Sequence, residues 1–134
     1  MKDLSAKEAW DFLDACSDAL LIDVRTPSEW ASVGFPDLSS LKRRALGLTW
    51  VADQEADFGH KLVEAVPDKA RPVVFMCRSG QRSTHAATAA ELLGYLNVFN
   101  VVDGFEDRHG PGTGWRASGL PFILLPLPEA KADA

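Results

Sequence analysis

The sequence contains two cysteines, and one of them opens a run of residues suited to nucleophilic chemistry, Cys77-Arg-Ser-Gly-Gln-Arg-Ser. A cysteine thiolate is stabilised by nearby cations, by the N-terminus of a helix and by converging backbone N–H groups. Arg78 and Arg82 supply two permanent charges. Gly80 lets the backbone curl so that successive N–H groups point inward, and a helix is expected to begin near Ser83. Cys77 is therefore the predicted catalytic residue. The predicted substrate-binding loop consists of Arg78, Ser79, Gly80, Gln81, Arg82 and Ser83.

The other cysteine has different neighbours. Cys16 stands at the end of an expected helix, beside Ser17 and Asp18, where carbonyl and anionic groups disfavour a thiolate. A packing role is expected for it, and a buried structural thiol is the alternative reading of Cys77. Neither cysteine has the Cys-x-x-Cys or Cys/His spacing of a zinc site, so no metal site is predicted.

Other polar residues have weaker claims to a catalytic role. Asp23 and Arg25 end an apolar run and could line the pocket in a supporting role, but a structural ion pair, with each other or with Arg82, is an equally good reading. Glu29 has the spacing of a helix-capping residue. His85 lies one turn into the helix after the loop, where a surface or packing role is favoured over proton transfer.

The elements around the loop follow from the hydrophobic pattern. Residues 73–76 form an apolar run typical of a buried strand, and an alanine- and leucine-rich stripe predicts a helix over residues 83–96. A second apolar run predicts a strand over residues 98–102, which completes a right-handed βαβ unit. Five glycines make residues 103–119 loop-like.

Two capping boxes mark helix starts in the first half of the chain, at residues 5–8 and 26–29. The first predicts a helix over residues 6–15, and the second a short helix carrying Trp30. The other expected elements are strands over residues 19–24 and 44–51 and a helix over residues 53–66. Alternating strands and helices predict an α/β domain with a mostly parallel central sheet and helices on both faces. Ligands bind such sheets at the carboxyl ends of the strands, where Cys77 lies.

Length and composition limit the class of protein. The 134 residues, 46% hydrophobic and 25% charged, suit one globular domain, expected over residues 1–126 with a flexible tail over residues 127–134. The formal net charge of -5 argues against nucleic acid as a partner. The charged N-terminus does not describe a signal peptide, and the apolar runs are too short to span a membrane. A cytoplasmic protein without a membrane partner is expected.

Four segments together resemble the single-domain rhodanese-like sulfurtransferases. Leu-Ile-Asp23-Val-Arg25-Thr-Pro-Ser-Glu-Trp resembles the first signature of that family, and the Cys77 run resembles its active-site loop. Asp-Gly104-Phe and the segment from Gly-Trp115 to Gly-Leu-Pro resemble its closing segments. The resemblance extends from Leu4 to Phe122. One departure is that Gly-Phe-Pro-Asp-Leu stands at residues 34–38, where the family usually has Gly-His-Ile-Pro-Gly-Ala.

The resemblance implies a double displacement in which the Cys77 thiolate takes a sulfane sulfur from a donor and passes it to a thiol or another nucleophile. The implied partners are a small-molecule or protein sulfur donor, such as thiosulfate, and a thiol acceptor, with no cofactor. Arg78, at the pocket mouth, is expected to meet the anionic donor. Arg82, where the helix begins, is expected to hold the loop by pairing with Asp23 or Glu29.

Two other functions compete with sulfur transfer. Cysteine phosphatases need Cys-x5-Arg to enclose phosphate, whereas the spacing from Cys77 to Arg82 is Cys-x4-Arg and residue 83 is serine. A non-catalytic rhodanese-like binding or regulatory module is the second alternative. Such modules often lack the cysteine nucleophile, which is present here.

Overall fold

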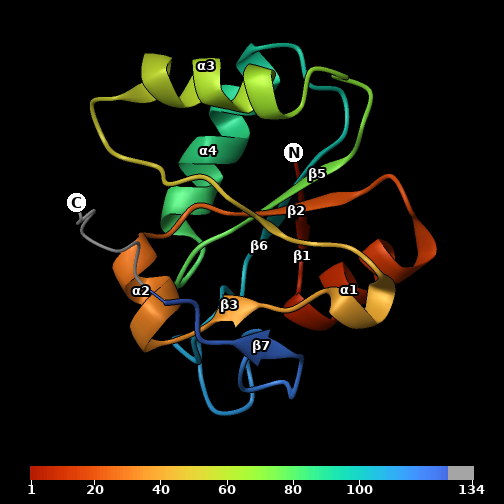
Figure 1. Ribbon diagram of the computed structural model, residues 1–134, viewed down its shortest axis with the longest axis vertical. Helices are drawn as coiled ribbons and strands as arrows, with labels where there is room; N and C mark the ends of the chain where they lie inside the picture. Colours follow the sequence, from red (N-terminus) through yellow and green to blue (C-terminus); the bar gives the residue numbers. More distant parts are fainter. Residues whose placement is uncertain (127–134) are drawn as a thin grey trace.

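The computed structural model describes residues 1–126, and the tail predicted over residues 127–134 lies outside the described residues. A five-stranded sheet in the order β1-β6-β5-β2-β4 forms the centre of the fold (Figure 1). Every neighbouring pair of these strands is parallel, and Ile22 of β2 stands beside Phe75 of β5. The predicted α/β fold with a parallel central sheet is confirmed. The strands are β1 (Lys2–Leu4), β2 (Leu20–Asp23), β4 (Leu46–Gly47), β5 (Val73–Met76) and β6 (Val98–Val101).

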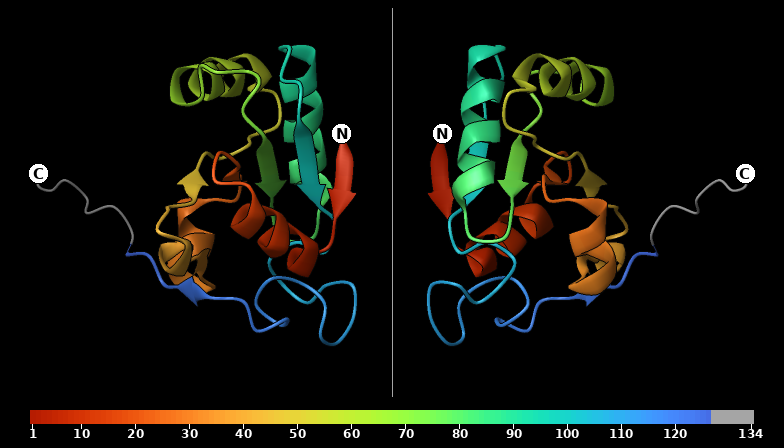
Figure 2. Two further views of the ribbon diagram at one scale, coloured as in Figure 1. Left: turned by 90° about the vertical axis from the view of Figure 1, so that its right-hand side faces the viewer. Right: turned by 90° about the vertical axis from the view of Figure 1, so that its left-hand side faces the viewer.

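Helices cover both faces of the sheet. Helices α3 (Glu55–Ala65) and α4 (Gln81–Leu92) pack on one face, over a core that includes Ile22, Phe75 and Leu62. Helix α1 (Ala6–Ala15) packs on the other face, over a core that includes Leu21 and Val74. Neighbouring residues of β2 and β5 thus enter opposite cores, which explains why β5 is apolar throughout and β2 is apolar up to Asp23 at its end. Figure 2 shows β1, β5 and β6 pointing the same way, toward the segment that follows β6.

Both predicted capping boxes are present. The Ser5 side chain accepts from the N–H of Glu8, whose carboxylate accepts from the N–H of Ser5. Thr26 and Glu29 make the same exchange at the start of α2 (Pro27–Ser32), with Pro27 in the first turn. Such caps satisfy N–H groups that have no partner inside the helix, and they fix where each helix begins.

The strand predicted over residues 44–51 is wrong in extent, because only Leu46–Gly47 forms β4. Ahead of it, Arg43 donates to carbonyls between α1 and β2, including Cys16 O at 3.1 Å and Ala19 O at 2.8 Å. Beyond it, the N–H of Leu48 still donates to Asp23 O at 3.0 Å and that of Trp50 to Val24 O at 2.9 Å. The segment therefore follows β2 to Trp50 with only a short ladder.

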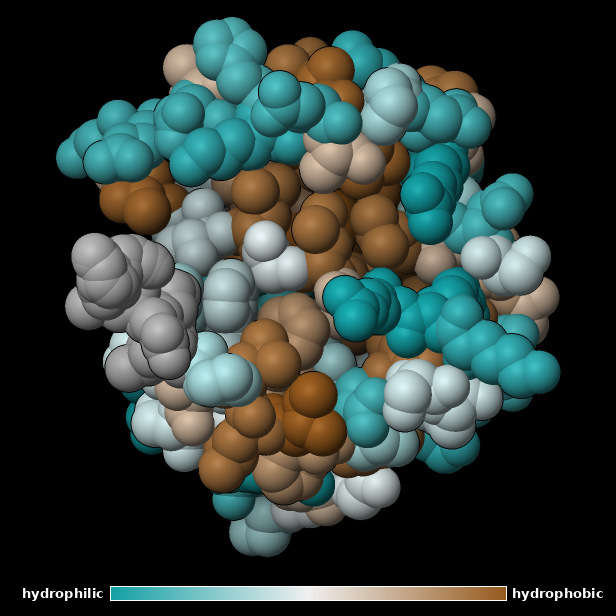
Figure 3. All heavy atoms as spheres, in the orientation of Figure 1, coloured by the Kyte–Doolittle hydropathy of each residue, from teal (hydrophilic) through white to brown (hydrophobic). Residues whose placement is uncertain are grey.

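The departure from the family pattern at residues 34–38 falls in a second, two-stranded sheet. There β3 (Phe35–Pro36) pairs antiparallel with β7 (Phe122–Ile123). In the space-filling view an apolar patch lies over these strands, where Phe122, Ile123 and Leu124 are exposed (Figure 3). A groove of about 530 Å³ adjoins it, lined by Trp30, Phe35, Leu38 and Ile123 among others.

No helix within residues 1–126 is long and apolar enough to cross a membrane. The same residues contain no group of three or more His, Cys, Asp or Glu side chains placed to hold a metal ion.

Candidate active site

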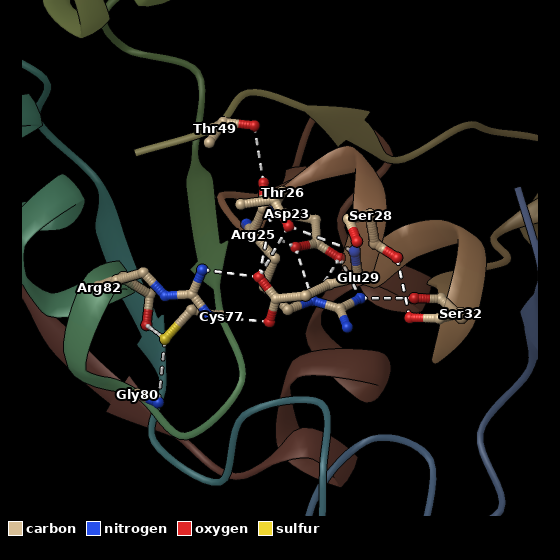
Figure 4. Close-up of polar contacts among 12 residues, drawn as sticks. Asp23, Arg25, Thr26, Ser28, Glu29, Ser32, Thr49, Cys77, Gly80 and Arg82 are labelled. Atoms are coloured by element: carbon tan, nitrogen blue, oxygen red, sulfur yellow. Dashed lines mark hydrogen bonds and ion pairs between the residues drawn. The ribbon is translucent and has the colours of Figure 1, made fainter. Parts of the chain in front are cut away.

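Cys77 directly follows β5, at the carboxyl edge of the sheet, and is only 1% exposed. Its Sγ accepts a hydrogen bond from the N–H of Gly80 at 3.1 Å (Figure 4). It accepts another from the hydroxyl of Ser83 at 3.3 Å. Gly80 is the residue before α4 and has a φ of 102°, a conformation that glycine adopts without a Cβ clash. The loop thus turns back over the sulfur and places two donors on it.

The carbonyls of the loop are turned away from the sulfur. Cys77 O accepts from the N–H of Phe105 at 2.8 Å, and Arg78 O accepts from the N–H of Glu106 at 3.2 Å. Ser79 O accepts from Nε2 of His109 at 2.7 Å. In a trans peptide the C=O and the following N–H point in opposite directions, so the N–H groups of residues 78–80 point to the other side of the loop. At Gly80 that side is occupied by the sulfur.

The start of α4 adds further donors. The N–H groups of Gln81, Arg82 and Ser83 have no hydrogen-bond partner among residues 1–126, as is usual in the first turn of a helix. Unpaired N–H groups and the helix dipole together favour an anion at this place. The chemistry that the site supports is therefore stabilisation of negative charge on or next to the Cys77 sulfur.

Gly104 lets the two loops approach closely. Its φ is 72°, and a Cβ there would lie 2.2 Å from Arg78 O and 2.7 Å from the Ser79 nitrogen. No side chain fits at that distance. The Asp-Gly-Phe segment is therefore a backbone contact surface for the Cys77 loop.

Arg82 joins the loop to α2. Its Nη1 and Nη2 donate to Oε1 and Oε2 of Glu29 at 2.8 and 2.9 Å, so Glu29 is the carboxylate that pairs with it (Figure 4). Burial raises the pKa of Glu29, but the hydrogen bond from Arg82, the N–H of Thr26 and the charge of Arg82 outweigh burial and lower the pKa from 4.5 to about 2. Glu29 therefore caps α2 and anchors the loop with one carboxylate.

Asp23 and Arg25 form a fully buried ion pair, with Nη2 to Oδ2 at 2.7 Å. The same Nη2 donates to Gly34 O at 2.7 Å, and the guanidinium lies 4.1 Å from the centroid of the Phe105 ring. Both side chains are 0% exposed, which favours the structural reading over the pocket-lining one. The pair holds together the segments on either side of the Cys77 loop.

Arg78 and His85, the other charged or titratable side chains considered for the site, are both exposed. Arg78 is exposed, and within residues 1–126 its guanidinium makes no ion pair. His85 is exposed and stacks on Trp50 with ring centroids 6.2 Å apart, which fits a packing role. A hollow of about 600 Å³ lies beside the loop, lined by Ser79, Gly80 and Gln81 among others.

The chain is similar to several known proteins over most of its length. A family model described as the STR4 middle domain matches residues 2–129. A crystal structure of Rv0390 from M. tuberculosis has 41% sequence identity and a TM-score of 0.78, covering 93% of this chain and 98% of that one. An uncharacterized protein of Rickettsia conorii is 36% identical over 123 residues, covering 91% of this chain and 97% of the relative.

A third relative has a name that states a reaction. The solution structure of the 30 kDa polysulfide-sulfur transferase homodimer from Wolinella succinogenes has 26% identity and a TM-score of 0.71, covering 92% of this chain and 78% of that one. The chain belongs to the rhodanese-like sulfurtransferase family, as the four segments of its sequence indicated.

Proposed function

We propose that this protein is a sulfurtransferase that moves a sulfane sulfur, through a persulfide on Cys77, from a donor such as thiosulfate to a thiophilic acceptor. The observation that carries the proposal is the pair of donors on the Cys77 sulfur, the Gly80 N–H at 3.1 Å and the Ser83 hydroxyl at 3.3 Å. A thiolate and a persulfide anion both need such donors.

The reaction is a double displacement in two balanced steps. The Cys77 thiolate attacks the outer sulfur of thiosulfate, a new S–S bond forms, the old S–S bond breaks, and its electron pair leaves with sulfite. A nucleophilic acceptor, such as a thiolate or cyanide, then attacks the outer sulfur of the persulfide and regenerates the thiolate. No electrons are gained or lost overall, so no redox partner is required.

Arg78 is the residue proposed to meet the donor. It follows the nucleophile directly, is exposed, and pairs with no carboxylate within residues 1–126, so its charge is available to an anion. Polysulfide is a second candidate donor, because the 26%-identical Wolinella relative carries that substrate in its name. Both donors present a sulfur next to negative charge.

The competing functions make different demands on the loop. A cysteine phosphatase needs Cys-x5-Arg to enclose phosphate, whereas the loop from Cys77 to Arg82 is one residue short and Arg82 is joined to Glu29 in a bidentate pair. A non-catalytic binding module is the other candidate, and the groove of about 530 Å³ beside the exposed β7 is the observation that favours it. Such a module would not depend on the Cys77 thiol.

Intact-mass measurement of the reduced protein after exposure to thiosulfate and to polysulfide tests the proposal. We expect the mass of one sulfur atom to be added to the wild type and to the matched control Cys16→Ser, and to be absent from Cys77→Ser. Cyanide should remove the added sulfur. Sulfur that remains on Cys77→Ser, or a wild type that accepts none from either donor, would contradict the proposal.

A further inference from the structure

We propose that His109 is a positioning residue for the proposed sulfur transfer: its imidazole N–H holds the Ser79–Gly80 peptide in the orientation that donates to the Cys77 sulfur. The inference rests on the proposed function for its consequence in catalysis. His109 lies 30 residues beyond Ser79 in the sequence, and no local pattern joins the two.

The bonds that hold the loop carbonyls are of two kinds. Cys77 O and Arg78 O are held by the main-chain N–H groups of Phe105 and Glu106. Ser79 O is held by a side chain, through Nε2 of His109 at 2.7 Å. Because a carbonyl oxygen only accepts, Nε2 must carry the proton in this contact. It is therefore the one bond of the three that a substitution can remove without altering the backbone.

Ser79 O belongs to the same peptide group as the N–H that binds the Cys77 sulfur. The N–H of the Ser79–Gly80 peptide donates to Cys77 Sγ at 3.1 Å, opposite the carbonyl that His109 binds. A donor on the carbonyl polarises the peptide and strengthens its N–H as a donor. The imidazole therefore fixes the plane of this peptide and increases its attraction for negative charge on sulfur.

The segment that carries His109 is itself held by local hydrogen bonds. The N–H of Arg108 donates to Glu106 O at 2.8 Å, and the Thr113 hydroxyl donates to Gly110 O at 2.8 Å. The close approach at Gly104 places the start of the segment against the loop. These hydrogen bonds hold the turn that presents the exposed imidazole of His109 to Ser79 O.

The experiment compares His109→Ala with His109→Gln, whose side-chain amide can donate to the same carbonyl. His60→Ala is the matched control, since His60 is exposed on α3. Two quantities are measured: steady-state sulfur transfer from thiosulfate, and the chemical shift of the Gly80 amide proton. For His109→Ala we expect kcat to fall about three- to tenfold with KM within about twofold, as for the loss of one hydrogen bond. The Gly80 amide proton should move upfield.

His109→Gln should recover most of both changes, and His60→Ala should match the wild type. An unchanged Gly80 shift in His109→Ala, or an unchanged kcat in an active protein, would overturn the inference. A wild type that transfers no sulfur would refute the proposed function instead, and the Gly80 shift would still decide whether His109 positions the peptide.

Discussion

Removing the charge of Glu29 tests whether the Glu29–Arg82 pair anchors the active-site loop. Glu29→Gln keeps the size of the side chain and a carbonyl oxygen for the Thr26 N–H, which donates to Glu29 Oε1 at 3.2 Å. It replaces Oε2, the oxygen facing Nη2 of Arg82, with an NH2 group that cannot accept a hydrogen bond. The variant therefore removes the bidentate ion pair and leaves the cap of α2 in place.

The expected loss of stability follows from the pKa of Glu29. Its fall from 4.5 to about 2 corresponds to about 3 kcal/mol before solvent screening is considered. Part of that fall comes from the hydrogen bonds of Thr26, which the variant keeps, and the Glu29 and Arg82 side chains are 22% and 32% exposed. The expected loss from removing the pair is therefore about 1–2 kcal/mol. The melting temperature of Glu29→Gln should then fall by about 3–8 °C at neutral pH. Sulfur transfer should fall as well, because the loop loses its tie to α2.

The pH dependence gives an independent check of the same pair. The pKa of Glu29 is lower in the folded protein than its ordinary value of 4.5, so the stabilisation is complete above that pH and is lost as the pH falls toward 2. Denaturant unfolding of wild type and Glu29→Gln at several pH values should show their difference shrinking from about pH 5 downward. Asp57→Asn is the control, because the Asp57–Lys61 pair is more than half exposed and should contribute little. A difference between wild type and Glu29→Gln that stays constant from pH 6 to pH 3 would refute the reasoning.

Two further substitutions separate recognition from architecture. Arg78→Ala should raise the KM for thiosulfate about tenfold and leave the melting temperature unchanged, because the exposed guanidinium is proposed to meet the donor; a lowered melting temperature with an unchanged KM would contradict that role. Gly104→Ala should destabilise the protein by about 1–3 kcal/mol and reduce sulfur uptake, since its Cβ would lie 2.2 Å from Arg78 O. Gly110 also has a positive φ, but among residues 1–126 no atom lies within 4 Å of a Cβ added there. Equal effects of Gly104→Ala and Gly110→Ala in thermal melts would therefore rule out the steric explanation.

Much of the fold could be predicted because its signals are local. The apolar runs of β2, β5 and β6 and the capping boxes of α1 and α2 lie within a few residues of the structures that they specify. β1 gives no such signal, since Lys2 and Asp3 are polar and exposed on a strand at the edge of the sheet, next to β6. The pairing of Phe35 with Ile123 joins two-residue strands far apart in the chain, which no periodicity can indicate.

The candidate site also has parts that the sequence predicts and parts that it does not. The loop residues and their charges are contiguous in the sequence, so the Cys77 loop could be predicted as a candidate site. The partner of Arg82 stayed open between Asp23 and Glu29, and the structure shows that it is Glu29. The groups that bind the loop carbonyls could not be predicted, because a main-chain N–H carries no residue signature and His109 is one of three histidines in the chain. Sequence reasoning identifies the charged side chains of the loop, whereas the orientation of the loop's peptide groups depends on tertiary contacts.

A buried ion pair next to this loop requires a physical reason, because two apolar side chains would often be at least as stable in its place. Arg25 supplies that reason through its other contacts. Its Nη2 donates at 2.7 Å both to Asp23 and to the carbonyl of Gly34, and its guanidinium lies 4.1 Å from the centroid of the Phe105 ring. The N–H of Phe105 in turn holds Cys77 O at 2.8 Å. An apolar residue could fill the space of Arg25 but could not bind a carboxylate, a carbonyl and an aromatic face at once. The pair therefore keeps the closing segment in register with the loop, and the Gly80 N–H faces the sulfur before any charge develops on it.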